Sequence, residues 1–215
     1  MSAKQRRTDK EIIQTRAIQT REKLLQTALK MYTQQGYYAT TVDQIAKEAG
    51  LSTGVAYRYF KNKKELLLEA LTYAFVNIKQ LTGVQETSLF DGNLEAALTA
   101  FEKIQIQYYD FHEELEGLRH SDKEVAELYD NFYDSAMQQI FEQLPQAIKD
   151  NQNAKEKLSI IIALMEHYCH ISAKEAVMAT KKESHKSKSF ELDLTFIRKK
   201  IFEITKELCY KKNLA

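Results

Sequence analysis

Turn-forming residues are scarce in this chain. Its 215 residues include one proline and six glycines, whereas average usage would give about eleven prolines and fifteen glycines. A β-sandwich or β-barrel needs turn residues about every 8–12 positions, and this sequence does not supply them. Apolar residues instead recur at spacings of three and four, which is typical of amphipathic helices. The sequence therefore predicts an all-α fold built of long helices.

Composition and the length of the apolar runs exclude further classes of protein. The 44% apolar and 28% charged residues are typical of a globular chain. The longest strongly apolar run, residues 158–165, is far shorter than the about 18 residues that a membrane span needs. The first seven residues hold no apolar segment of the secretory type, and Cys169 and Cys209 are too few for a disulfide scaffold. We therefore expect a cytoplasmic protein with no membrane partner.

Charge is distributed unevenly along the chain. Residues 1–64 contain 13 Lys and Arg against 5 Asp and Glu, a net of +8. Residues 65–215 contain 18 against 25, a net of −7, so the whole chain has a net charge of +1. A basic first third is typical of a chain end that meets a polyanion. The alternative is that this uneven charge arises by chance from charged residues on solvent-exposed faces.

Three segments are predicted: a basic arm over 1–17, a compact helical segment over 18–78 and a larger helical segment over 79–215. The arm is expected to be mobile or loosely helical, either lying along DNA or serving as a solubilising tail. A first helix is expected from near Thr20 to Gln35, since apolar residues recur on one face and Gly36 follows as a stop.

Two short helices and a longer one are predicted next, each from its capping residue. Thr41 with Gln44 forms a capping box for a helix that stops at Gly50. Ser52 is the N-cap candidate of the second short helix. Asn62 with Glu65 forms another box, which opens the longer helix.

Two short helices around a glycine-containing turn form a helix-turn-helix pattern. The N-terminal amides of helices capped by Thr41 and Ser52 can donate to phosphate oxygens. Gly54 allows close approach to a groove wall. The second helix also carries donors and flat apolar rings suited to bases and backbone, namely Tyr57, Arg58 and Tyr59, with Lys63 following.

Residues 20–75 closely resemble the DNA-binding domain of TetR-family transcriptional regulators. The matching text is Tyr-Tyr-Ala-Thr-Thr-Val-Asp-Gln-Ile-Ala-Lys-Glu-Ala-Gly over 37–50, followed by Leu-Ser-Thr-Gly-Val-Ala-Tyr-Arg-Tyr-Phe over 51–60 and Lys-Asn-Lys-Lys-Glu-Leu over 61–66. The resemblance covers the first third of the chain. The remaining helices of this family diverge widely, so they carry no comparable motif.

The resemblance implies roles for individual residues. It makes Thr41 a phosphate-contacting cap, and Thr53, Gly54 and Val55 the leading edge of a recognition helix. Arg58 occupies a variable position, where many relatives have an aromatic residue and a guanine contact is one outcome. The implied DNA-binding set is Thr41, Ser52, Thr53, Gly54, Val55, Tyr57, Arg58, Tyr59 and Lys63. The alternatives are that Tyr57 and Tyr59 pack inside the domain and that Lys63 is an ordinary solvated lysine; Phe60 is assigned to the core.

The C-terminal segment is predicted to hold long helices. Ser121 to Glu124 reads as a capping box that opens one of them, and Pro145 ends or kinks it. Two more are expected over about 154–179 and 190–211, joined by a polar loop over 181–189. In the resembled family the last two helices pair with their symmetry mates, which implies a homodimer reading a near-palindromic double-stranded DNA operator. The alternative is that their apolar stripes form intramolecular core.

A pocket for an apolar or aromatic small molecule is expected among the central helices, although such aromatic stripes are more often plain core. Its candidate residues are Phe101, Tyr108, Phe111, His112, Phe132, Tyr133, Met137, Met165 and Tyr168, with Tyr109 beside them. His167, Cys169 and His170 lie close in sequence with Glu166, but they lack further converging ligands, so neither a metal site nor a cofactor is expected. No catalytic set is recognisable, so an enzyme is not expected.

The predicted function is a ligand-responsive DNA-binding repressor that a small molecule releases from its operator. One alternative is an activating or nucleoid-type DNA binder without a small ligand. Another is a helical enzyme or protein-interaction module whose basic end is incidental.

Overall fold

The structure is a computed structural model that describes residues 3–77, 94–181 and 193–210. All regular secondary structure in these residues is helical, which confirms the all-α prediction. The chain groups into two compact units. The first unit comprises Met1–Asn77 with Glu113–Leu128, and the second comprises Ile78–His112 with Tyr129–Ala215.

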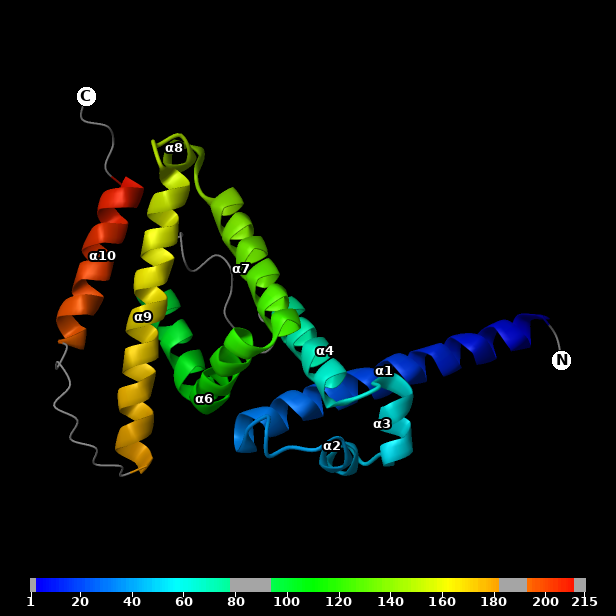
Figure 1. The fold of residues 1–215 in the computed structure, drawn as a ribbon. Helices are drawn as coiled ribbons and strands as arrows, with labels where there is room; N and C mark the ends of the chain where they lie inside the picture. The colour runs from blue at the N-terminus through cyan, green and yellow to red at the C-terminus, as the bar shows by residue number, and fades with distance from the viewer. Residues whose placement is uncertain (1–2, 78–93, 182–192, 211–215) are drawn as a thin grey trace. The chain divides into compact units, whose positions relative to one another are not determined.

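The first unit contains the four N-terminal helices and a later stretch of chain. The helices are α1 (Ala3–Gln35), α2 (Val42–Glu48), α3 (Thr53–Tyr59) and α4 (Lys63–Val76). α1 packs against α2 and α4, and α2 packs against α3 (Figure 1). The later stretch is the end of α6 (Leu94–Ser121) and the start of α7 (Lys123–Gln143). This contribution of residues 113–128 is not anticipated by the three-segment prediction.

α1 is far longer than expected. The predicted start near Thr20, after a loosely helical arm, is wrong, since the helix begins at Ala3. The added residues contain neither glycine nor proline and are rich in straight-chain helix formers. The hydroxyls of Thr15 and Thr20 also donate to the carbonyl oxygens of Glu11 and Arg16, one turn earlier.

The core of the first unit is formed by the apolar faces of its helices. Gly36, directly after α1, has a φ angle of 87°, and Gly50, two residues after α2, has a φ angle of 68°. Glycine adopts such positive φ angles without steric cost, and they are common where helices end. The apolar side chains of this unit that are at most 4% exposed are Leu24, Leu25, Ala28, Tyr32, Val42, Ile45, Ala46, Ala49, Ala56, Phe60, Leu66, Leu67, Ala70, Leu71 and Val125.

The second unit contains α8 (Gln146–Lys149), α9 (Ala154–Lys181) and α10 (Leu194–Tyr210), together with parts of α6 and α7. α9 and α10 lie side by side (Figure 1). Pro145 occupies the N-cap position of α8, two residues beyond the end of α7. The expected loop over 181–189 lies almost wholly outside the described residues. A buried cluster joins α6, α9 and α10 through Leu98, Ile161, Met165, Tyr168, Cys169 and Ile201.

The boundary between α6 and α7 differs from the predicted capping box. Ser121 is the last residue of α6, and its hydroxyl donates to the carbonyl oxygen of Gly117. Asp122 caps α7 instead, since its carboxylate accepts hydrogen bonds from the backbone N–H groups of Glu124 and Val125. Aspartate is as good an N-cap as serine, and here it lies one residue nearer the helix.

A membrane span requires a long and strongly apolar helix. None of the helices within residues 3–77, 94–181 and 193–210 meets both conditions.

Candidate nucleic-acid interface

Thr41 sets the start of α2 through the predicted capping box. The Thr41 hydroxyl accepts from the backbone N–H of Gln44 at 3.3 Å, and the Gln44 side chain accepts from the Thr41 N–H at 2.8 Å. Both side chains are exposed. The cap therefore fixes the helix end while it leaves the threonine at the surface.

α3 has one face in the core and one face outside it. Ala56 and Phe60 are buried, whereas Tyr57 is 52% exposed and Arg58 is also exposed. Ser52 occupies the predicted N-cap position, but its side chain makes no capping hydrogen bond. Only its backbone carbonyl serves the helix, by accepting from Val55 and Ala56. The Ser52 hydroxyl is exposed.

Gly54 is a glycine that the fold does not require. Its φ angle is not in the left-handed region, and a Cβ added to it would meet no heavy atom within 4 Å outside its two chain neighbours and the adjacent backbone of its own helix. Glycine in a helix costs up to about 1 kcal/mol relative to alanine. Thr53 and Val55, on either side of it, are half-buried. Gly54 thus leaves the exposed start of α3 without a side chain, so a flat surface can approach its backbone closely.

Tyr59 and Lys63 lie at the other end of the motif. Tyr59 is half-buried, with its ring centroid 6.3 Å from that of Phe60. The Lys63 Nζ donates to the Tyr38 carbonyl at 3.3 Å and lies 4.2 Å from the centre of the Tyr37 ring. Partial burial lowers the pKa of Lys63 below its usual value, and the nearby Glu114 carboxylate works in the opposite direction. Lys63 is therefore a placed cation rather than a freely solvated one.

The predicted box at Asn62 is formed only in part. The Asn62 side chain accepts from the Glu65 N–H at 2.8 Å, as expected of an N-cap. The Glu65 carboxylate, however, accepts from the N–H of Lys61 and not from that of Asn62. These two hydrogen bonds still fix the first turn of α4, where Lys63 lies.

Two further residues contribute to this region that are not among the predicted DNA-binding residues. Tyr38 is 66% exposed beside Lys63, and its carbonyl holds the lysine. Glu114, 77 residues beyond Tyr37, accepts a hydrogen bond from the Tyr37 N–H. The tandem tyrosines are a visible signal for the first, but no local pattern marks the second.

The predicted pocket residues of the second unit do not share one environment. Met165 and Tyr168 are 4% exposed within the buried cluster, and Phe101 packs against it. The His112 ring lies 6.0 Å from the ring of His170, which also contacts Tyr109 at 5.6 Å. Phe111 is buried. The remaining candidates are half-buried: Tyr108, Phe132, Tyr133 and Met137.

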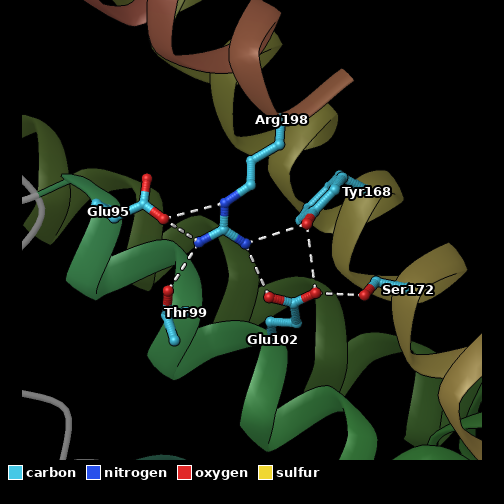
Figure 2. A network of polar contacts seen from close by, with 6 residues as sticks. All are labelled: Glu95, Thr99, Glu102, Tyr168, Ser172 and Arg198. Carbon is cyan, nitrogen blue, oxygen red and sulfur yellow. Dashed lines mark hydrogen bonds and ion pairs between the residues drawn. The ribbon is translucent and has the colours of Figure 1, made fainter. Parts of the chain in front are cut away.

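A polar network lies beside that cluster and ties α10 to α6 and α9 (Figure 2). Arg198 donates to Glu102 at 2.9 Å, to Tyr168 at 3.1 Å and to Thr99 at 2.8 Å. It also pairs with Glu95, and Ser172 donates to Glu102. Burial opposes the guanidinium charge, but these partners outweigh it and raise the pKa of Arg198.

The residues weighed for a metal site have dissimilar surroundings. Cys169 is fully buried, whereas His167 is exposed. Burial raises the pKa of the Cys169 thiol to about 12, which disfavours the thiolate that metals bind.

Comparison with known proteins identifies the N-terminal part of the chain. The family model for bacterial regulatory proteins of the tetR family matches residues 24–70. The uncharacterised HTH-type transcriptional regulator YxaF of Bacillus subtilis (strain 168) is 35% identical over 100 residues, which cover 46% of this chain and 51% of YxaF. The matched region thus spans about half the length of this curated relative.

Solved structures extend the likeness in fold to most of the chain. A TetR transcription regulator from Haloarcula marismortui ATCC 43049 has a TM-score of 0.61 at 16% identity, over 86% of this chain and 96% of that one. A transcriptional regulator from Saccharomonospora viridis, solved in complex with choline, has a TM-score of 0.57 at 18% identity, over 87% and 96%. Residues 24–70, with their helix-turn-helix geometry, therefore match the family of bacterial regulatory proteins of the tetR type.

Proposed function

We propose that this chain is a sequence-specific transcriptional regulator that reads double-stranded DNA with α3. The observation that carries the proposal is that Gly54 is exposed on α3 although the surrounding protein leaves space for a larger side chain there. The exposed residues Tyr57 and Arg58 lie on the same short helix. Tyr57 and Arg58 would contact base edges and backbone in the major groove. The proposed phosphate contacts are Thr41, Tyr59, Lys63 and the N-terminal amides of the helix capped by Ser52. Thr53, Gly54 and Val55 would form the leading edge of the recognition helix.

The proposal includes a homodimer formed through α9 and α10. Ile160 on α9 and Phe196 on α10 are 57% and 56% exposed, which is high for large apolar side chains. Burying them against a second copy would remove this apolar surface from water. A two-fold dimer would place two recognition helices about 34–36 Å apart, matching a near-palindromic operator.

The proposal further includes release from the operator by a small molecule, with cytoplasmic repression as the outcome. A tenfold loss of DNA affinity needs about 1.4 kcal/mol of coupling between the two sites. Its support is the likeness in fold to a regulator solved with choline. The burial of Met165 and Tyr168 in an apolar cluster favours the alternative, in which this region is core and the DNA binder has no ligand.

The test is DNA binding by the purified full chain. We would measure fluorescence anisotropy with DNA flanking its own gene, across a salt series and with non-specific competitor. Tight, competitor-resistant binding is the expected result, with affinity that falls as salt rises because phosphate contacts release counterions. Absence of binding even at low salt would refute the proposal, and a compound that releases the DNA would distinguish the repressor from the ligand-free alternative.

A further inference from the structure

Glu114 of α6 is fitted to the turn that follows α1. Its carboxylate accepts a hydrogen bond from the backbone N–H of Tyr37. A Cβ on Gly36 would collide with the same carboxylate, so the missing side chain at Gly36 makes room for it. All three residues belong to the first unit. An acidic side chain from far along the sequence thus holds the entry to the helix-turn-helix motif.

The turn held by Glu114 in turn holds Lys63. The ring of Tyr37 lies under the Lys63 ammonium, and the carbonyl of Tyr38 accepts from it. A cation over an aromatic face is attracted to it, so ring and carbonyl restrict where the ammonium points. Any movement of the Tyr37 backbone would therefore change the placement of Lys63.

The same segment of the first unit also holds the next residue of α4. The Lys64 Nζ lies 2.7 Å from an Asp122 carboxylate oxygen and 3.1 Å from a Glu124 oxygen. This pairing lowers the pKa of Asp122, chiefly through the hydrogen bond from Lys64. Residues 114–124 thus hold the first turn of α4 at two points, one through the Tyr37 turn and one directly.

We infer that Glu114 is a positioning residue for DNA binding, which acts through Tyr37 to aim the Lys63 ammonium at a backbone phosphate. The inference rests on the proposed function, since it presupposes that Lys63 meets DNA. Glu114 itself carries a negative charge, so it would repel DNA if it acted only through long-range charge. A positioning role therefore predicts the opposite sign: removing this acid weakens binding.

The experiment uses the full chain and the duplex that it selects from a random-sequence library. Glu114→Ala removes the acceptor, and Glu114→Asp keeps the charge but withdraws it from the Tyr37 N–H. We expect both to lower affinity by about tenfold and to reduce the salt dependence by about one phosphate contact. Glu114→Gln retains an acceptor oxygen for the Tyr37 N–H, so this variant should keep most of the wild-type affinity. Glu127→Ala is the matched control, because it removes an exposed acid of residues 113–128 that pairs with Lys123.

A double-mutant cycle with Lys63→Met separates positioning from a general structural effect. If Glu114 acts through Lys63, then Glu114→Ala costs little further affinity once the ammonium is gone. Additive losses, an unchanged salt dependence, or equal effects of Glu114→Ala and Glu127→Ala would overturn the inference. Thermal unfolding of each variant checks the fold, and Glu114→Asp carries the cycle if Glu114→Ala is unfolded.

A wrong DNA contact for Lys63 and a wrong role for Glu114 give different results. If the chain selects no duplex, or if Lys63→Met leaves affinity and salt dependence unchanged, the proposed DNA contact of Lys63 is wrong. If Lys63→Met weakens binding while both Glu114→Ala and Glu114→Asp do not, the contact stands and the role of Glu114 is wrong.

Discussion

The Lys63 ammonium lies 4.2 Å from the centre of the Tyr37 ring, at the start of α4. Its partial burial there lowers the pKa of Lys63. The charged form, which binds phosphate, is lost as pH rises through the folded-state pKa. That loss begins at a lower pH than for an ordinary lysine, whose pKa is about 10.4.

The first prediction is therefore a pH dependence of DNA affinity. From about pH 7 to about pH 9.5, the wild type should lose affinity relative to Lys63→Arg, because the guanidinium stays charged throughout. The measurement is the ratio of the two dissociation constants across this range, which cancels effects of pH common to both proteins. A constant ratio would contradict the prediction.

The second prediction concerns Gly54. Glycine to alanine in an unstrained helical site stabilises folding by about 0.4–1 kcal/mol, so Gly54→Ala should raise the unfolding free energy. A methyl group on the face against DNA should at the same time weaken binding by about tenfold or more. Gly117 is the matched control, since it is also a helical glycine whose added Cβ would meet nothing within 4 Å beyond its chain neighbours and its own helix backbone. Gly117→Ala should stabilise the fold and leave binding unchanged.

The third prediction separates the two outward residues of α3. Arg58→Ala should cost about 1–3 kcal/mol of binding and relax the preference at one base pair if the guanidinium reads a base. Tyr57→Ala should weaken binding while dimerisation and thermal stability are unchanged, because the ring is 52% exposed. Selection of binding sites from a random library would report both effects. An unaltered affinity of Tyr57→Ala would remove this residue from the interface.

The fourth prediction tests the proposed dimer. Phe196→Glu and Ile160→Glu place a charge on the exposed apolar positions of α10 and α9, and each should shift the chain to monomer. Val76→Glu is the control, since Val76 is 77% exposed on α4, outside the proposed interface. Sedimentation equilibrium gives the oligomeric state. A dimer that survives both changes would rule out this surface.

The fifth prediction concerns the network around Arg198 (Figure 2). Arg198→Met would leave the Glu102 carboxylate, 18% exposed, with only Ser172 and Tyr168. The expected cost is about 2 kcal/mol, less than for a fully buried pair. Lys200→Met breaks the exposed pair with Glu203 and should cost at most about 1 kcal/mol. Urea unfolding of both variants would show whether the network stabilises the second unit.

The helix-turn-helix motif is predictable because its signals are local. Thr41 and Asn62 reach only three residues along the chain for their capping contacts, so the sequence displays each helix start. The length of α1 is not predictable in this way. Polar helical residues without an apolar stripe look the same as a disordered arm, and helix propensity alone decides weakly between them.

Long-range contacts account for what sequence analysis does not find. Glu114 meets Tyr37 across 77 positions, and Arg198 meets Glu95 and Glu102 across about a hundred. Glutamates and arginines are frequent on helices, and no spacing rule distinguishes these from solvated ones. Ser52 shows the reverse case: the residue type fits a cap, yet its hydroxyl makes no such bond. Tertiary packing decides these details.

Because Cys169 is buried, its reaction with a thiol reagent would report when the second unit opens. A thiol reagent attacks the thiolate, and this side chain is both fully buried and held in its neutral form, with a pKa near 12. Modification must therefore wait until the cluster of Leu98, Met165 and Ile201 opens. In a chain with Cys209 replaced by serine, the labelling rate would time that opening without any added probe. A compound that binds the closed state of this unit would lower the labelling rate of Cys169, whether or not DNA is present.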